Sequence, residues 1–167
     1  MSVNITIKVS GINELIRDYE KFRFDMKENM IVPIDESAMK YLKVISANFQ
    51  SQGKTFGEPW PPLSQATINI KRALSKQGKS IAITTPLVRT GKMRSGFGRQ
   101  TKGKNKADIY NTQAYSIVHQ EGQTVSWKGR PVKIPRRVLA EVDDERINMV
   151  AAVFTKWFDN IVNKNKL

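Results

Sequence analysis

The chain has 167 residues, a net charge of +13 and no cysteine, which excludes disulfide bonds, thiol catalysis and cysteine-ligated zinc. Its length fits one domain, so we expect residues 1–167 to form a single unit. There is no apolar run of about 18 residues and no basic block followed by an apolar block at the start. The sequence therefore predicts neither a membrane-spanning helix nor a secretory signal.

The positive charge is concentrated in the middle of the chain. Residues 53–112 carry 12 basic and 2 acidic side chains, whereas residues 1–52 carry seven of each. Residues 113–142 add a net charge of +3, and residues 143–167 are balanced. A positive field of this size favours an anionic partner, either a nucleic acid or an acidic protein surface.

The first 53 residues predict a strand followed by two helices. Strict alternation in VNITIKV, residues 3–9, indicates a strand with one buried face. After Gly11, helical spacing of apolar side chains predicts the first helix; these side chains are Ile12, Leu15, Ile16, Tyr19 and Phe22. Pro33 and Asp35 mark the start of the second helix, which should end near Gly53.

The next segment is predicted to contain loops and short helices. Residues 52–64 are rich in glycine and proline and should form a loop. Ser64 can cap a short helix that runs to about Lys76. Residues 75–84 are predicted to be mobile, and residues 85–97 to form a turn and a short helix.

Two hairpins and another short helix are expected next. Residues 97–102 and 107–112 should pair as strands, with the basic sequence TKGKNK, residues 101–106, at the tip. AYSIVHQEG, residues 114–122, predicts a short helix with an apolar face formed by Ala114, Ile117 and Val118. Gly122 should end it as a left-handed terminator. Residues 123–134 alternate enough for a hairpin around Lys128 and Gly129.

The C-terminal region predicts one long helix. Asp143 or Asp144 should open it, because acidic side chains complement the helix dipole there. We expect Trp157 in the core, beside a buried stripe formed by Ile147, Val150, Ala151, Phe154, Phe158 and Ile161. The predicted class is α+β, with a small, mostly antiparallel sheet packed against two or three long helices. We expect the single domain to have three parts: a strand and helices in residues 1–53, a basic motif-bearing region in 54–142 and a helix in 143–163.

The only histidine, His119, is a poor candidate for catalysis or metal binding. Hydrolytic zinc sites need three protein ligands that commonly include two histidines. No G-x-S-x-G turn is present to expose a serine nucleophile, although His119 could in principle serve Ser116 or a distant serine. Tyr115 lies four residues earlier on the same helix face, so packing between these two side chains is the better interpretation. The sequence predicts no catalytic residue, metal or cofactor.

The basic middle region supports two interpretations. Cations near Phe97 and Tyr110 could contact phosphates or an acidic partner; the candidates are Lys92, Arg94, Arg99, Lys102, Lys104 and Lys106. The alternative is a set of solvated surface side chains at turns, since the sequence contains no recognised nucleic-acid-binding motif.

Four segments in a fixed order carry a family resemblance. They are Gly53 with residues 60–64, Thr67 and Lys71; residues 87–93; residues 114–115 with 119–122; and residues 134–137 leading to 143–145. Together they resemble the phage virion morphogenesis family, the tail completion proteins of tailed phages such as Mu. The resemblance covers roughly residues 49–146. Met93 stands where the family usually has leucine, and Arg136 where it has a small residue.

The resemblance implies a structural role in the virion and no enzymatic activity. Such proteins are expected at the neck, in a ring that we expect to be hexameric, where they join the tail to the DNA-filled head. The implied partners are other copies of the chain, neighbouring neck and tail proteins, and DNA that passes through the neck, with no membrane. The implied location is the tail or neck of the virion, and the host cytoplasm during assembly.

The resemblance also suggests which residues lie near a contact between subunits or with a partner: Trp60, Arg89, His119 and Arg137. Arg137 is a candidate for a bidentate hydrogen bond to a carboxylate. Trp60, held between prolines, could fill a pocket in its own chain or in a neighbouring subunit. For each of the four, packing within its own subunit is the alternative.

Overall fold

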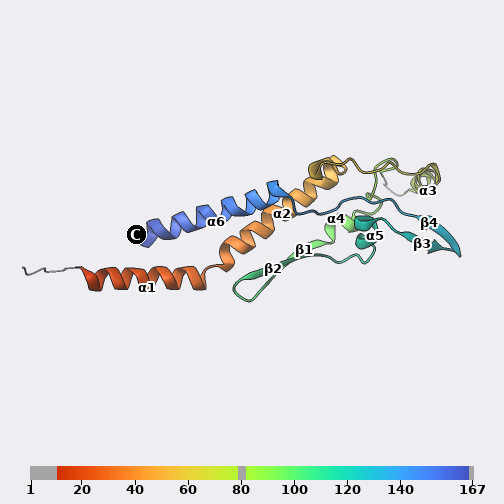
Figure 1. Ribbon diagram of the computed structural model, residues 1–167. Helices are drawn as coiled ribbons and strands as arrows, with labels where there is room; N and C mark the ends of the chain where they lie inside the picture. Colours follow the sequence, from red (N-terminus) through yellow and green to blue (C-terminus); the bar gives the residue numbers. More distant parts are fainter. Residues whose placement is uncertain (1–10, 79–81, 166–167) are drawn as a thin grey trace, which may run out of the picture.

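The computed structural model describes residues 11–78 and 82–165, so the strand predicted over residues 3–9 lies outside the described part. The three long helices lie toward one end of an elongated molecule, with the hairpin of residues 97–111 alongside them, and the short helices and the hairpin of residues 124–133 lie toward the other end (Figure 1). The long helices are α1 (Ile12–Glu28), α2 (Ile31–Ser51) and α6 (Asp144–Asn165). The predicted α+β class is confirmed.

Helix α1 has the predicted apolar stripe, but most of it is uncovered. Ile12, Leu15, Ile16 and Tyr19 are 49–63% exposed. Phe22 alone of the stripe is half-buried, and its ring meets the ring of Phe158 edge-on at 6.0 Å.

The contact between α1 and the end of α6 is partly polar. The Asp25 carboxylate accepts hydrogen bonds from Lys164 Nζ at 3.1 Å and Asn165 Nδ2 at 3.3 Å. These donors lower the pKa of Asp25, and Lys164 makes the largest contribution. The two helices are therefore tied together near the point where α1 ends.

Helix α2 begins two residues before Pro33 and ends at Ser51. Proline in the first helical turn leaves no hydrogen bond unmade, because the amides there have no partner within the helix. Ile45 and Phe49 are almost completely buried, as the apolar repeat predicts. After the helix, Gln52 (φ 54°) and Gly53 (φ 98°) turn the chain sharply.

The strands form two separate antiparallel hairpins rather than the one small sheet that the sequence suggested. The first, β1 (Phe97–Lys102) with β2 (Lys106–Asn111), packs along α2 (Figure 1). The second, β3 (Thr124–Trp127) with β4 (Arg130–Lys133), lies at the opposite end from α1. Its turn residues Lys128 and Gly129 both have positive φ, as a tight two-residue hairpin requires.

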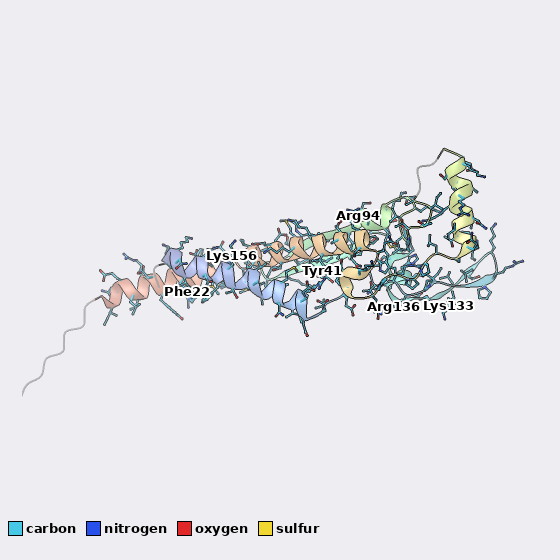
Figure 2. All side chains as sticks on the ribbon, turned by 90° about the horizontal axis from the view of Figure 1, so that it is seen from above. Phe22, Tyr41, Arg94, Lys133, Arg136 and Lys156 are labelled. Carbon is cyan, nitrogen blue, oxygen red and sulfur yellow. The ribbon has the colours of Figure 1, made fainter. Side chains whose placement is uncertain are left out.

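Four short helical elements connect these parts: the 3-10 turn η1 (Lys54–Phe56), α3 (Gln65–Lys76), α4 (Lys92–Ser95) and α5 (Ser116–Glu121). The predicted cap of α3 is confirmed, because Ser64 Oγ accepts a hydrogen bond from the Thr67 amide at 3.3 Å. In Figure 2, Lys133 and Arg136 lie at the opposite end of the molecule from Phe22.

The apolar face of α5 is largely uncovered, since Ala114 is exposed and Ile117 is 55% exposed. One detail of the α5 prediction, its ending, is wrong. Gly122 has the expected positive φ of 74°, but its ψ of 115° lies outside the left-handed helical region. The chain extends there because it passes close to Arg136; a Cβ on Gly122 would lie 2.6 Å from the Arg136 amide nitrogen.

Helix α6 starts as predicted but is rotated relative to its predicted stripe. Asp143 caps it by accepting a hydrogen bond from the Arg146 amide at 2.9 Å. The guanidinium of Arg146 lies 5.0 Å from the centre of the Phe56 ring and donates to the Thr55 carbonyl at 2.7 Å. Burying this arginine turns the helix, so three residues of the predicted stripe are exposed: Ile147, Ala151 and Phe158.

The inward face of α6 contains a different set of residues. Val153 and Ile161 are buried, and Val150, Phe154 and Trp157 are half-buried. Trp157, predicted in the core, packs edge-on against Phe154 at 6.3 Å between ring centres.

The main core forms where the end of α2 meets two distant segments. Its buried members are Ile45, Phe49, Phe56, Trp60, Met93, Val138 and Leu139. The Val138 carbonyl accepts two hydrogen bonds of 2.8 Å, from Asn48 Nδ2 and Trp60 Nε1. Gln120 Oε1 accepts from the amides of Leu139 and Ala140, and its Nε2 donates to the Ala140 carbonyl. Residues 138–140 are thus held by side chains from three separate parts of the chain.

Gly53 provides the first test of this packing. A Cβ at residue 53 would lie 2.4 Å from the Glu58 carbonyl oxygen and 2.5 Å from the Trp60 ring, whereas a Cβ at Gly57 would meet nothing. Both glycines have positive φ, so alanine at either costs about 1–2 kcal/mol in backbone strain. The clash adds about 1–3 kcal/mol at residue 53 alone. In urea denaturation, we expect Gly53→Ala to be clearly less stable than Gly57→Ala; equal losses would contradict the seating of Trp60.

Candidate functional site

A cavity of about 540 Å³ lies among α3, α4, α5 and the loops that connect them. We call it the basic cavity. Its lining residues are Leu63, Thr67, Lys71, Leu87, Arg89, Thr90, Lys92, Met93, Gln113, Tyr115, His119 and Arg137. All four segments that carry the family resemblance contribute to this lining. Four of the residues are lysine or arginine, and none is acidic.

Lys71 lies in α3 and is only 4% exposed. Its Nζ donates hydrogen bonds to the carbonyls of Ala82 at 2.8 Å and Thr85 at 2.7 Å. Burial lowers the pKa of Lys71, and the charge of Arg89 lowers it further. An ammonium group has three protons to donate, so one remains after these two carbonyl contacts.

Arg137 is equally buried, at 4% exposed, and no carboxylate among the described residues pairs with its side chain. One terminal nitrogen donates to the Pro61 carbonyl at 3.0 Å, and Nε has no hydrogen-bond partner among the described residues. The Arg137 amide donates to the His119 carbonyl at 2.6 Å, which places the side chain beside α5. Burial lowers the pKa of Arg137, although a guanidinium remains charged at neutral pH.

His119 is half-buried, and its Nδ1 has no hydrogen-bond partner among the described residues. Burial lowers the pKa of His119, and the nearby positive charge of Arg137 lowers it further. The imidazole is therefore neutral at physiological pH. The lining offers no carboxylate to orient it as a general base, which a catalytic triad requires.

Three of the four predicted contact residues meet in this cavity. Arg89, His119 and Arg137 line it together, but Trp60 does not. Trp60 is 6% exposed and packs edge-on against Phe49 within its own chain, which is the alternative that the sequence left open. Lys71 was not predicted as a site residue, although its helical spacing from Thr67 indicates that both side chains face the same site.

The six basic residues proposed to contact DNA or an acidic partner are not gathered at one place. Lys92 alone of them lines the basic cavity. Arg99 makes a bidentate contact with Asp35, Lys102 and Lys106 both pair with Asp108, and Lys104 pairs with Glu28. Arg94 donates to Ser46 Oγ at 2.9 Å. Five of the six thus have partners inside the chain.

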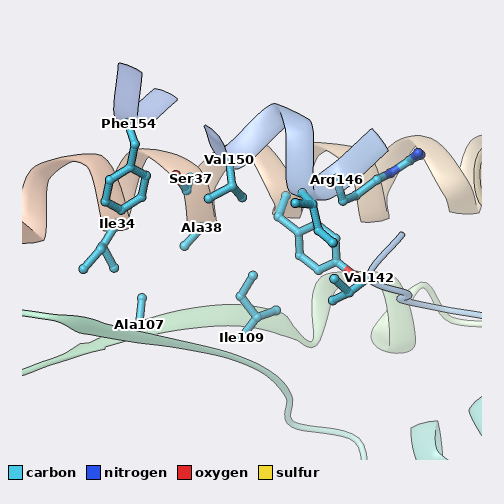
Figure 3. Close-up of a pocket in the computed structure, with 11 residues that line it drawn as sticks. Ile34, Ser37, Ala38, Ala107, Ile109, Val142, Arg146, Val150 and Phe154 are labelled. Carbon is cyan, nitrogen blue, oxygen red and sulfur yellow. The ribbon is translucent and has the colours of Figure 1, made fainter. Parts of the chain in front are cut away.

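A second cavity of about 490 Å³ is an apolar groove between α2, β2 and the first turns of α6 (Figure 3). Ile34, Ile109, Val142, Val150 and Phe154 line it from these three sides. Its polar groups are already engaged: the Tyr41 hydroxyl donates to the Glu141 carbonyl, and Arg146 pairs with Asp143. Apolar lining of this kind can bind an apolar surface but provides no acid or base.

Within residues 11–78 and 82–165, no cluster of histidine, cysteine, aspartate or glutamate could hold a metal ion. No helix in the same ranges is long and apolar enough to cross a membrane.

The sequence model of the phage virion morphogenesis family matches residues 23–159, which include every segment that lines the basic cavity. The chain belongs to this family. This phage virion morphogenesis protein is thus related to structural components of the virion. No significant match was found to a curated protein or to a solved structure.

His119 gives a pH prediction for this virion protein. Its pKa in the folded chain lies below the usual 6.5, so the unfolded chain takes up the proton first on acidification. The contribution of the neutral His119 to the free energy of unfolding should therefore be present above about pH 6.5 and be lost as the pH drops below it. We expect the melting temperature to be lower at about pH 5.5 than at about pH 7.5.

The control for this prediction is His119→Gln, which removes the only histidine in the chain. Its melting temperature should change much less over the same interval, because carboxylates titrate mainly at lower pH. An equal decrease in both proteins would show that His119 is not the group responsible.

Proposed function

We propose that this virion morphogenesis protein is a tail completion or neck subunit that acts by assembling into a ring and docking to neighbouring virion proteins. The observation that carries the proposal is the lining of the basic cavity. Four separated segments bring cations and apolar side chains together there, without an acid or an oriented base. That composition suits recognition of another surface and offers no means of breaking a bond. We accordingly propose no catalytic step.

The large exposed surface supports assembly with other copies. The chain exposes 12143 Å², whereas a compact monomer of 19.0 kDa exposes roughly 8,400 Å². A standard protein–protein interface covers about 800 Å² on each partner, so the excess is large enough for several contacts. The uncovered stripe of α1 and the apolar groove beside α6 are two apolar parts of that surface.

A ring requires each subunit to present two different surfaces that match each other. Helix α1 lies at one end of the elongated molecule, and α3, α4 and α5 lie toward the other (Figure 1). The basic cavity is lined by residues of these three short helices and the loops between them. We propose the α1 stripe as one surface of the contact between copies. Ring size, which we expect to be six, follows from the family resemblance alone.

Nonspecific DNA binding is the alternative function, and the arrangement of charges supports it less well. Five of its six candidate cations already have partners within the chain. Exposed ion pairs are weak, so phosphates could still compete for these side chains. Binding of this kind would weaken steeply with salt, because the bound cations release counterions from DNA.

The test of assembly compares two substitutions that each add one negative charge to α1. Leu15→Asp places the charge in the apolar stripe, and Asn13→Asp places it on an exposed polar residue of the same helix. By sedimentation, we expect a defined oligomer, formed alone or on addition of tails, for the unaltered protein and for Asn13→Asp. We expect Leu15→Asp to remain monomeric.

Two results would contradict the proposal. One is a strict monomer at high concentration that tail proteins leave unchanged. The other is absence of the protein from purified, infectious particles analysed by mass spectrometry.

A further inference from the structure

We propose that the basic cavity is a socket for a carboxylate, supplied by an acidic segment of a different virion protein. The proposal deepens the proposed function, on which it depends for the kind of partner. It adds a binding site, the residues that form it and the chemistry of the group that enters it.

The cavity contains positive charge that no acidic side chain in its lining compensates. Lys71 and Arg137 are each 4% exposed, and Arg89 and Lys92 add two exposed cations to the same cavity. Its lining contains no aspartate or glutamate. Buried cations are normally paired, because removing a charge from water costs several kcal/mol. A carboxylate in the cavity would supply the missing charge.

The chain itself offers no candidate for this carboxylate among its acidic side chains. All 15 lie within residues 11–78 and 82–165, and none of them lines the cavity. Residues 1–10, 79–81 and 166–167 contain no aspartate or glutamate. An aspartate or glutamate side chain that enters the cavity would therefore come from another molecule.

The two buried cations also have hydrogen-bond donors that remain available for a ligand. Among the described residues, Arg137 uses one terminal nitrogen for the Pro61 carbonyl and leaves Nε without an acceptor. Lys71 uses two of its three protons. A guanidinium presents its donors in a planar fork that matches a carboxylate, so Arg137 is suited to this ligand once one enters.

The shape of the site favours a protein carboxylate over a DNA phosphate. DNA presents a continuous row of charges, one per roughly 1.7 Å, which exposed cations can follow along a surface. Here the two most buried cations lie in a recess whose walls include Leu63, Leu87 and Met93. A single acidic side chain on a protruding segment can enter such a recess, and its own apolar neighbours can contact these walls.

The overall charge favours a different protein over a second copy. Each chain carries a net charge of +13, so a second copy would bring further positive charge toward a cavity whose lining is already cationic. An acidic partner is attracted to the same field, which raises the rate of association and selects against wrong partners.

His119 makes the test direct, because the only histidine in the chain lines the cavity. Its imidazole proton resonances would be followed by NMR in tag-free protein while a hexaglutamate peptide is added. We expect a saturable shift and a raised pKa of His119, since a nearby negative charge stabilises the imidazolium. The charged groups that line the same cavity are Lys71, Arg89, Lys92 and Arg137, with Tyr115 as the other titratable group. Hexaglutamine is the neutral control peptide and should cause no shift.

A matched pair of double variants tests the location. Arg89→Gln with Lys92→Gln removes two exposed charges from the cavity, and Lys102→Gln with Lys104→Gln removes two from the tip of the first hairpin. We expect hexaglutamate to bind at least tenfold more weakly to the cavity variant and almost unchanged to the hairpin variant. All four side chains are exposed, so both proteins should fold.

Three outcomes would overturn the proposal. The first is no His119 shift with hexaglutamate at low salt, and the second is equal weakening in both double variants. The third is a larger His119 shift and tighter binding with a thymidine hexanucleotide, which would assign the cavity to nucleic acid. None of these results depends on assembly, so ring formation and presence in the particle remain separate tests of the proposed function.

Discussion

The Val138 carbonyl is the point on which the arrangement of the distant segments depends. It accepts hydrogen bonds from Asn48 of α2 and from the indole of Trp60. Gln120 of α5 satisfies the amides of the next two residues. A buried polar backbone must be paired, so this extended segment can lie in the core only if all three side chains are in place. The first role of the family motifs is thus structural, because their residues pack together in one core.

The same constraint positions the basic cavity. Once residues 138–140 are fixed, Arg137 must lie beside α5, where its amide meets the His119 carbonyl. Its guanidinium then reaches the Pro61 carbonyl, in the loop that follows Trp60. Arg137 is therefore anchored beside the buried core, which reduces the conformational entropy that it loses when it binds a partner.

The sequence predicted the local elements well, because their signals are local. Alternation and the Lys128–Gly129 turn specify a hairpin, and Ser64 specifies the start of α3. The rotation of α6 was missed because it depends on Arg146 packing against Phe56, a buried charge that apolar periodicity does not reveal. The order of the motifs identified the family, but their meeting in one cavity depends on contacts between segments far apart in the chain. For the same reason, the sequence left open whether Trp60 packs in its own chain.

The chain combines a buried core beside a cationic recess with long helices that carry uncovered apolar surface. The most direct measurement is a reconstruction of the mature particle at side-chain resolution. The account predicts this chain at the neck, with the α1 stripe buried against a neighbouring copy and a carboxylate of another protein within reach of Arg137. A particle that lacks the chain, or that contains it with both surfaces facing solvent, would contradict the account.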